Sequence, residues 1–539
     1  MRVNDRIMRY SLIYKIEEKI NFFIDKPIIS LFIIGIVSLA IRLLFFEPDI
    51  PIRQDANAYF DYAMDMSILH YFPYSAHAND GWPMVLSLIF SSFNFDNYLD
   101  YTILQRITTI VISTLTIVPM YYLCKKFFNP TYSLVGAALF VFHPHIIQNS
   151  FLGLTESLYI ILAISALSLF LSDNKKLMYY SFAIVAFATL VRAEGIILLF
   201  ILSILFFIFN KKDKKIIGKF FISIIIFIII FGSMTLIKID TIQGVEGTAA
   251  ENIVDWTYST ISNEDNSIGK SMSVGLENLI KRVAQSMIPY FALFVPFGLI
   301  LLFKDKNKNK FLIMIVLIIY LIALVRMLSV VSDGRLLLVL YPLFVILSLY
   351  TIQHITEKFE FKKIFLILMI CGCIILSSYF LYSNNDSEYQ KEAYTFANYM
   401  VNNVAVSNNF YPESGLVYGA WASSELKYPS LSTDVEYTGP QLLDYVKGTY
   451  FSNATNPVYL TQSADSVEGY IKLARNQNLS HLVIDDNNKR TPYFKNIFHN
   501  EEKYPYLIKQ FDSVKEGYTH YNVKVFKIDY RYFDLILTK

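Results

Sequence analysis

Apolar runs of about twenty residues recur between Pro27 and Leu381, and they constrain the fold of this chain more than any other feature. Each run is long enough to cross a hydrocarbon core of roughly 30 Å. The chain is 54% hydrophobic and only 17% charged, which excludes a string of soluble domains over this region. After Tyr382 the sequence becomes an ordinary mixture of polar and apolar residues. We therefore predict a polytopic α-helical membrane protein that ends in a separate polar domain.

We predict about eleven membrane-spanning helices from these runs. The first run is too long for the apolar region of a typical signal peptide, so we interpret it as an uncleaved anchor. The approximate ranges of the spans are 28–46, 102–123, 131–149, 154–172, 177–191, 195–209, 216–238, 285–303, 311–330, 334–352 and 363–382.

Lysine and arginine are distributed unevenly between alternate loops, and this sets the orientation. The basic N-terminus belongs with the loops that contain Lys125, Lys211 and Lys304, whereas the opposite loops hold few basic residues. The positive-inside rule then places the N-terminus inside and residues 384–539 outside. We expect a multi-pass protein of the plasma membrane.

This topology divides the chain into a transmembrane catalytic domain, 1–383, and a small extracytoplasmic α/β domain, 384–539. The first external loop, 47–101, is predicted to hold interfacial helices, one of them in the short apolar stretch from Trp82 to Phe93. A second external loop, 240–284, is polar. In the C-terminal domain we expect helices at 389–400, 441–446 and 467–476 and strands at 416–418, 458–460, 481–484 and 523–528.

Four places at the predicted external face carry ionisable groups at helix ends, where a membrane protein keeps them only at a cost. Asp55 begins a stretch that would place it on one helix face with Tyr59 and Ala63, or it caps an interfacial helix. Glu156 follows Thr155, and these two residues could equally form the cap and first turn of a span. Both carboxylates therefore have a structural and a functional interpretation.

Two arginines complete the set. Arg192 and Glu194 stand in a break between two apolar runs, where a local ion pair at a tight turn is the simpler interpretation. Arg335 precedes another run, where its side chain could snorkel to the interface. Taken together, however, two carboxylates and two arginines converge on one membrane face. Carboxylates serve as general bases and arginines bind phosphate, so the combination fits group transfer away from a phosphate leaving group.

In this order and topology the residues resemble the GT-C superfamily of integral membrane glycosyltransferases, in particular its protein O-mannosyltransferase and aminoarabinose-transferase branch. The resemblance covers roughly residues 28–350. It departs from the family pattern at Ala56, where a second acid is frequent, and at Leu336, where an aromatic residue is frequent. The segments that carry it are Gln54-Asp55-Ala56-Asn57-Ala58-Tyr59, Gly81-Trp82-Pro83, Leu154-Thr155-Glu156-Ser157-Leu158, Arg192-Ala193-Glu194-Gly195, and Arg335 with Pro342.

The resemblance implies transfer of a single sugar, a mannose-like hexose, by an inverting displacement. The donor would be linked to polyprenyl or dolichyl phosphate, and the acceptor would be a protein, a glycan or a lipid. Asp55 would act as the base or orient the acceptor hydroxyl, and Glu156 would hold one of the sugars. Arg335, supported by Arg192 or Arg53, would stabilise the charge on the phosphate.

The resemblance also implies supporting roles for Tyr59 and Glu194. We expect no cofactor to be required and predict no metal-ligating residues; a divalent metal stays open as an alternative, although nothing in the sequence indicates one. The expected partners are the lipid-linked donor, the acceptor and membrane lipids. A net charge of +2 gives no reason to expect nucleic acid.

Two other functions stay open. A transporter or flippase of lipid-linked sugars would be expected to show internal repeats with broken helices, and the sequence shows no repeat. A polymerase or ligase of surface polysaccharide would be expected to have a large basic external loop, and the loop 240–284 is only weakly basic.

Overall fold

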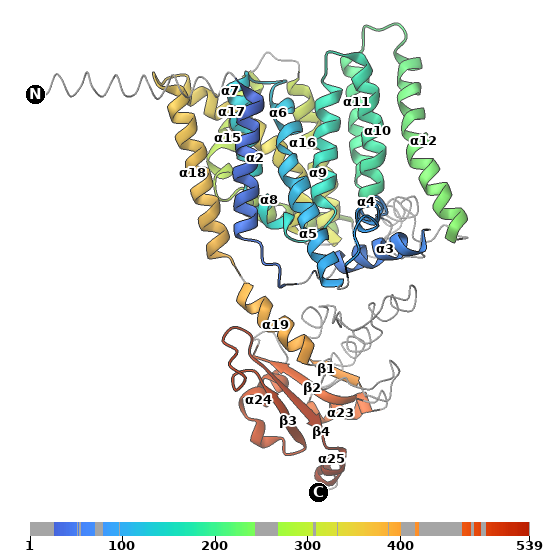
Figure 1. Cartoon of the computed structure of the whole chain (residues 1–539), viewed down its shortest axis with the longest axis vertical. Coiled ribbons are helices and arrows are strands. Elements are labelled where there is room, and N and C mark those ends of the chain that lie inside the picture. The colour runs from blue at the N-terminus through green and yellow to red at the C-terminus, as the bar shows by residue number, and fades with distance from the viewer. Residues whose placement is uncertain are drawn as a thin grey trace, which may run out of the picture. The chain divides into compact units, whose positions relative to one another are not determined.

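The computed structural model describes most of the chain (Figure 1). It forms two compact units: Met1–Phe46, Tyr71–Leu88 and Gln105–Asn384 make the first, and Glu47–His70, Ile89–Leu104 and Asn385–Lys539 make the second. The division into 1–383 and 384–539 stays a prediction. The described residues are 26–50, 52, 55–70, 79–95, 98–242, 268–304, 309–330, 333–385, 387–399, 416–419, 466–475, 479–486 and 492–537.

Helices build the first unit, and they follow the predicted apolar runs. Proline at the first helical position starts several of them, and Asn129 caps α7 by accepting a hydrogen bond from the backbone N–H of Tyr132 at 3.2 Å. The elements are α2 (Pro27–Leu44), α4 (Gly81–Phe90), α5 (Tyr98–Leu115), α6 (Ile117–Cys124), α7 (Pro130–Val141), α8 (Pro144–Ser150), α9 (Glu156–Phe170), α10 (Lys175–Val191), α11 (Gly195–Phe209), α12 (Ile216–Ile242), α14 (Ile268–Ser286), α15 (Phe291–Lys304), α16 (Lys310–Val330), η1 (Gly334–Leu340), α17 (Tyr341–Thr356) and α18 (Lys362–Ser383).

The structure corrects the sequence at two places in this unit. The predicted span 131–149 is two helices, α7 and α8, because Pro144 holds the preceding His143 in an extended conformation. The prediction of a polar loop at 240–284 is wrong over residues 268–284, because these residues belong to the amphipathic helix α14. Helix α15, which corresponds to the predicted span 285–303, therefore begins only at Phe291, after a bend of 110° between α14 and α15.

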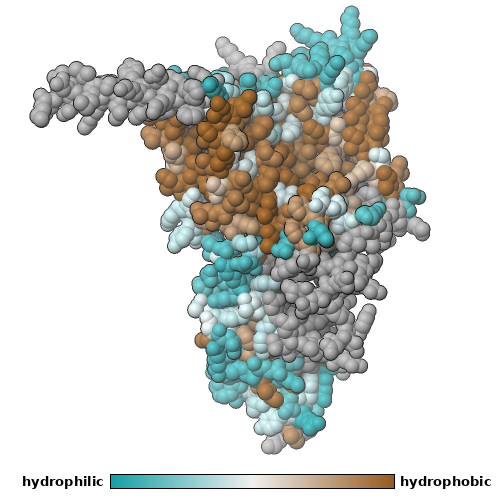
Figure 2. Space-filling view, in the orientation of Figure 1, coloured by the Kyte–Doolittle hydropathy of each residue, from teal (hydrophilic) through white to brown (hydrophobic). Residues whose placement is uncertain are grey.

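Within the described residues, six helices are long and apolar enough to cross a membrane, or seven if the bent pair α14 and α15 counts as one span. Four shorter apolar helices, α4, α7, α9 and α11, accompany them. Apolar side chains such as Phe32, Phe221 and Leu368 are exposed on the outer surface of these helices. Figure 2 shows this apolar surface on one face of the molecule. A membrane protein is thus supported, whereas the count of eleven spans and their orientation stay predictions.

The second unit contains a small mixed sheet with the strand order β1-β2-β4-β3. Strand β1 (Leu416–Gly419) runs parallel to β2 (Leu479–Asp485), whereas β4 (Val523–Ile528) is antiparallel to both β2 and β3 (Leu507–Asp512). Apolar side chains of β2 and β4 are buried against the neighbouring helices. The helices of this unit are α3 (Asp55–Leu69), α19 (Ser387–Tyr399), α23 (Val467–Arg475), α24 (Pro492–His499), η5 (Glu501–Lys503) and α25 (Tyr530–Leu537).

Most of the C-terminal elements that the structure describes were predicted. The strands at 416–418, 481–484 and 523–528 and the helices at 389–400 and 467–476 are confirmed. The segments 441–446 and 458–460 lie outside the described residues. Strand β3 was missed, because its side chains Ile508, Lys509 and Gln510 break the alternation of apolar and polar residues that marks a half-buried strand.

Glu392 on α19 joins this helix to the backbone of residues 519–521. Its carboxylate accepts hydrogen bonds from the backbone N–H groups of Thr519, His520 and Tyr521 at 2.6–2.8 Å. The pKa of Glu392 lies below its ordinary value. Burial raises this pKa, but the hydrogen bonds from the three backbone N–H groups lower it by more than burial raises it. The contribution to stability is thus present above the unfolded pKa of about 4.3 and is lost as the pH falls through the lower folded value.

We expect Glu392→Gln to leave at least one of these N–H groups without a good acceptor, at a cost of about 1–3 kcal/mol. Hydrogen exchange at residues 519–521 of the full-length protein, measured near pH 7, should become faster. The exposed Glu502→Gln is the matched control. Unchanged exchange in Glu392→Gln would contradict the anchoring role of this carboxylate.

Candidate active site

Glu156 is the first residue of α9, and it is only 5% exposed. Its Oε1 accepts a hydrogen bond from Arg192 Nη1 at 2.8 Å. Its Oε2 is buried and has no hydrogen-bond partner among the described residues. Leaving a buried carboxylate oxygen unpaired is costly, so a native protein rarely does so without a functional reason. Thr155 stands in the N-cap position, but its hydroxyl accepts from Arg192 Nη1 at 3.0 Å and does not cap α9.

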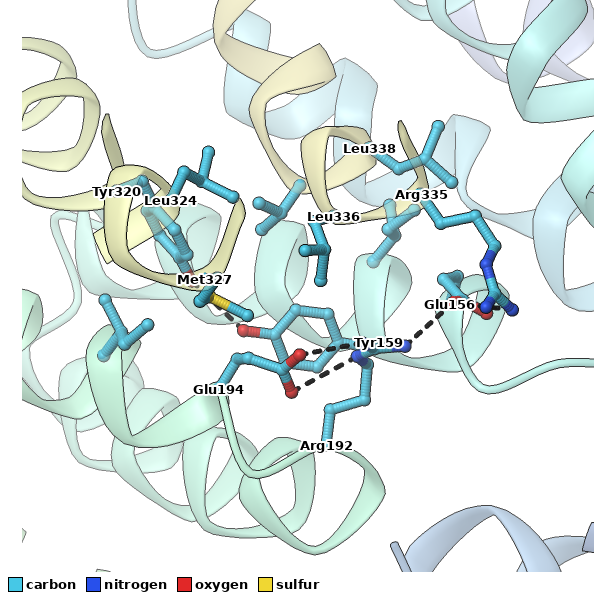
Figure 3. A pocket seen from close by; sticks show the side chains of 13 residues that line it. Glu156, Tyr159, Arg192, Glu194, Tyr320, Leu324, Met327, Arg335, Leu336 and Leu338 are labelled. Atoms are coloured by element: carbon cyan, nitrogen blue, oxygen red, sulfur yellow. Dashed lines mark hydrogen bonds and ion pairs between the residues drawn. The ribbon is translucent and has the colours of Figure 1, made fainter. Parts of the chain in front are cut away.

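Arg192 ends α10 in an extended conformation and joins the break before α11 to the start of α9. Its Nη2 and Nε donate to the two carboxylate oxygens of Glu194 at 2.7 and 3.3 Å, while Nη1 donates to Glu156 (Figure 3). The predicted local ion pair is therefore present and extends to a second carboxylate. The pKa of Glu194 lies below its ordinary value, because the effect of burial, which raises it, is outweighed by the charge and hydrogen bonds of Arg192.

Arg335 reaches the same group from η1. Asp333 caps this short helix by accepting from the backbone N–H of Arg335 at 2.9 Å, and its other oxygen accepts from Arg335 Nε at 2.6 Å. Arg335 Nη1 lies 3.9 Å from Glu156 Oε1, and Figure 3 shows the two side chains meeting. The Arg335 side chain is 31% exposed, so its guanidinium group can still contact a ligand. Asp333 thus holds the arginine extended toward Glu156.

These charged groups line an open pocket, whose empty space is about 390 Å³ when the open solvent at its mouth is included. Tyr159, one turn after Glu156, and Tyr320 on α16 meet in it, with their hydroxyl oxygens 3.1 Å apart. The rest of the wall is apolar. The apolar lining residues are Ile160, Ile197, Leu324, Met327, Leu336, Leu338 and Val339. The pocket therefore combines two guanidinium groups and two carboxylates with a wall suited to a hydrocarbon chain.

The structure brings together Glu156, Arg192, Glu194 and Arg335. The sequence predicted that these residues converge on one membrane face. Asp55 and Tyr59 lie in the second unit: Asp55 is exposed at the start of α3, and Tyr59 is buried one turn later. Their convergence with the pocket stays a prediction. Arg53 lies outside the described residues.

Sequence reasoning missed three polar groups of this site. Tyr159 could have been found from its i+3 spacing to Glu156. Asp333 is separated by one residue from Arg335, so a charge pair was readable there. Tyr320 stands in an apolar span with no local signal. Across the described part of the chain, no three histidine, cysteine, aspartate or glutamate residues are grouped as metal ligands would be.

A family model described as dolichyl-phosphate-mannose-protein mannosyltransferase matches residues 102–237, from α5 to α12. A search of curated proteins finds no match. Among solved structures, ArnT from Cupriavidus metallidurans bound to undecaprenyl phosphate is similar at a TM-score of 0.53 and 10% identity, over 94% of this chain and 98% of that one. The apo oligosaccharyltransferase of Archaeoglobus fulgidus is similar at a TM-score of 0.52 and 13% identity, over 85% of this chain and 69% of that one.

The family model, which matches residues 102–237, and the shared fold both agree with the resemblance to the GT-C superfamily of membrane glycosyltransferases that the sequence indicated. Both findings favour a glycosyltransferase over the transporter alternative. The sugar, the acceptor and the membrane face belong to the proposal that follows.

Proposed function

We propose that this enzyme transfers a single mannose-like hexose from a polyprenyl- or dolichyl-phosphate-linked donor to a protein, glycan or lipid acceptor at the external face of the plasma membrane. The observation that carries the proposal is the buried Glu156 carboxylate, with one oxygen unpaired, beside two guanidinium groups in a pocket with an apolar wall. Guanidinium groups bind phosphate, the unpaired oxygen can accept from a sugar hydroxyl, and the wall can hold isoprenoid units.

The two arginines are suited to different tasks. Arg192 is held by both Glu194 and Glu156, so it mainly fixes the position of these carboxylates. Arg335 is more exposed and reaches the pocket from η1, so it would bind the donor phosphate. An arginine that contacts the phosphate stabilises the negative charge that builds up on it as the sugar leaves. Arg53 would assist from the first external loop.

The reaction is an inverting displacement. The acceptor oxygen forms a bond to the anomeric carbon, while the bond from that carbon to the phosphate oxygen breaks and its electron pair leaves with the lipid phosphate. Asp55 would take the proton of the acceptor hydroxyl, or orient that hydroxyl if the proton leaves later. Glu156 would hold a sugar hydroxyl and so fix the ring during the attack.

The test compares the wild type with Asp55→Asn in liposomes that contain a radiolabelled polyprenyl-phosphate-mannose pool. We expect transfer by the wild type and a rate at least about 100-fold lower for Asp55→Asn, since positioned general bases contribute factors of this size. Label is followed into protein, glycan and lipid fractions. Asp173→Asn, which changes an exposed carboxylate in the loop before α10, is the matched control and should keep the wild-type rate.

Each other result has a definite meaning. Equal rates in the wild type and in Asp55→Asn would keep the enzyme but remove Asp55 from the chemistry. Absence of transfer by the wild type from any lipid-phosphate sugar would contradict the proposed donor class. Retention of the anomeric configuration in the product would contradict the single displacement.

A further inference from the structure

Three consecutive residues at the start of α4, Asp80, Gly81 and Trp82, contact three separate parts of the first unit, although none of them lines the pocket. The sequence resemblance marks this segment only as the beginning of a helix. Two of the contacted parts lead directly into Glu156 and Arg192.

Trp82 holds the turn before α9. Its indole ring is fully buried, and Nε1 donates to the carbonyl oxygen of Gly153 at 3.1 Å. The buried Gln105 of α5 donates from Nε2 to the same oxygen at 2.8 Å. Gly153 has a φ of +72°, a conformation that other residues rarely adopt, and stands three residues before Glu156. The carbonyl is thus fixed from two sides, which sets the path of the chain into Glu156.

Gly81 lies against the end of α10. A Cβ atom at this position would lie 2.7 Å from the backbone nitrogen of Val191 and 2.9 Å from the carbonyl carbon of Leu190. Such distances are shorter than any normal contact, so only glycine allows the two backbones to approach this closely. Val191 directly precedes Arg192. The same short segment thus touches the chain before each of the two paired side chains.

Asp80 anchors the segment to α12. Its Oδ1 lies 2.5 Å from Lys238 Nζ, and the two side chains are only 8% and 1% exposed. A buried ion pair adds little net stability compared with apolar residues, but it penalises any arrangement in which the charges separate. The pair therefore fixes where α4 begins relative to α12.

We propose that Asp80, Gly81 and Trp82 form a positioning segment that sets the distance between the Glu156 carboxylate and the Arg192 guanidinium group. The inference rests on the proposed function, since it matters for transfer only if this pair holds the reacting groups. The segment acts on geometry, since none of its three residues lines the pocket. A displacement of about 1 Å in such a pair can lower a rate by as much as about 100-fold.

The test is Trp82→Phe, which keeps an aromatic ring and removes the N–H donor. We expect kcat to fall about tenfold, with KM for polyprenyl-phosphate-mannose changed less than about twofold, because the displaced pair affects the reaction more than donor binding. Gln105→Met removes the other donor to Gly153 and should act in the same direction. Tyr290→Phe is the matched control: it also removes one buried donor, to the carbonyl of Leu139 at 2.6 Å, and should leave kcat unchanged.

A kcat for Trp82→Phe and Gln105→Met equal to that of Tyr290→Phe would overturn the inference, and so would a raised KM at unchanged kcat. If the wild type transfers no sugar, the proposed function fails. The positioning role of the segment is then tested separately, by hydrogen exchange at residues 151–156 and 192–195. Faster exchange there in Trp82→Phe than in Tyr290→Phe would support the segment's role. Equal exchange would overturn it.

Discussion

Glutamine in place of Glu156 is expected to lower the rate of sugar transfer at least about 100-fold, an effect as large as the one predicted for Asp55→Asn. Oε1 of this carboxylate accepts from Arg192, and Oε2 is buried without a partner. An amide of the same size has one acceptor oxygen and one NH₂ group. If the oxygen faces Arg192, the NH₂ group replaces the acceptor that would hold the sugar; in the other orientation the NH₂ group meets the arginine.

The measurement is the initial rate of transfer from polyprenyl-phosphate-mannose in liposomes, together with the unfolding temperature. Glu357→Gln is the matched control, because this exposed carboxylate directly follows α17 and accepts from Gln353 Nε2 of that helix at 2.8 Å. It should transfer at the wild-type rate. A Glu156→Gln protein that is stable and transfers normally would remove this carboxylate from the site.

Lysine in place of Arg335 is expected to lower kcat/KM for the lipid-linked donor about 10- to 100-fold. Hydrogen bonds to charged groups contribute about 1.5–3 kcal/mol, and each 1.4 kcal/mol is a factor of ten. Arg335 holds Asp333 through Nε while Nη1 extends toward Glu156. The ammonium group of lysine keeps the charge but is a single point, so it cannot contact Asp333 and a phosphate in the same geometry.

Inhibition by the free polyprenyl phosphate is the measurement that isolates this role, because the inhibitor lacks the sugar. Its inhibition constant should rise in Arg335→Lys by a factor similar to the fall in kcat/KM. Arg326→Lys on α16 is the control: Arg326 Nη1 bonds to Ser329 Oγ at 3.2 Å and does not line the pocket. If inhibition by the free phosphate is as strong in Arg335→Lys as in the wild type, Arg335 does not bind the phosphate.

The sequence indicated the charged half of the site because ionisable residues are conspicuous beside apolar runs. Glu156, Arg192, Glu194 and Arg335 each stood at the end of such a run, and the structure brings all four together. The superfamily resemblance rested on these residues together with the segments at Asp55 and Gly81, and the family model and the fold agree with it. The positions of Asp55 and Arg53 relative to this group stay predictions.

The breaks in the helices were harder to predict. Pro144 divides one predicted span into α7 and α8, and hydropathy alone did not show it because Val141-Phe142 before it and Ile146-Ile147 after it continue the apolar run. Helix α14 was taken for part of a loop, since its polar face lowers the mean hydropathy although its apolar residues recur at helical spacing. Averaging the hydropathy over a window therefore concealed both the break at Pro144 and the helix α14.

The sequence by itself determined that the chain is a membrane protein, where its apolar runs lie and which charges stand at their ends. These properties are local, since burial of an uncompensated charge is costly wherever the run is placed. Only the tertiary structure decided which apolar side chains form the pocket wall, that Tyr320 meets Tyr159, and that Trp82 and Gln105 share the Gly153 carbonyl. Inside a membrane, lipid-facing and protein-facing residues are equally apolar, so the partner of each helix face depends on close packing and on hydrogen bonds between distant segments.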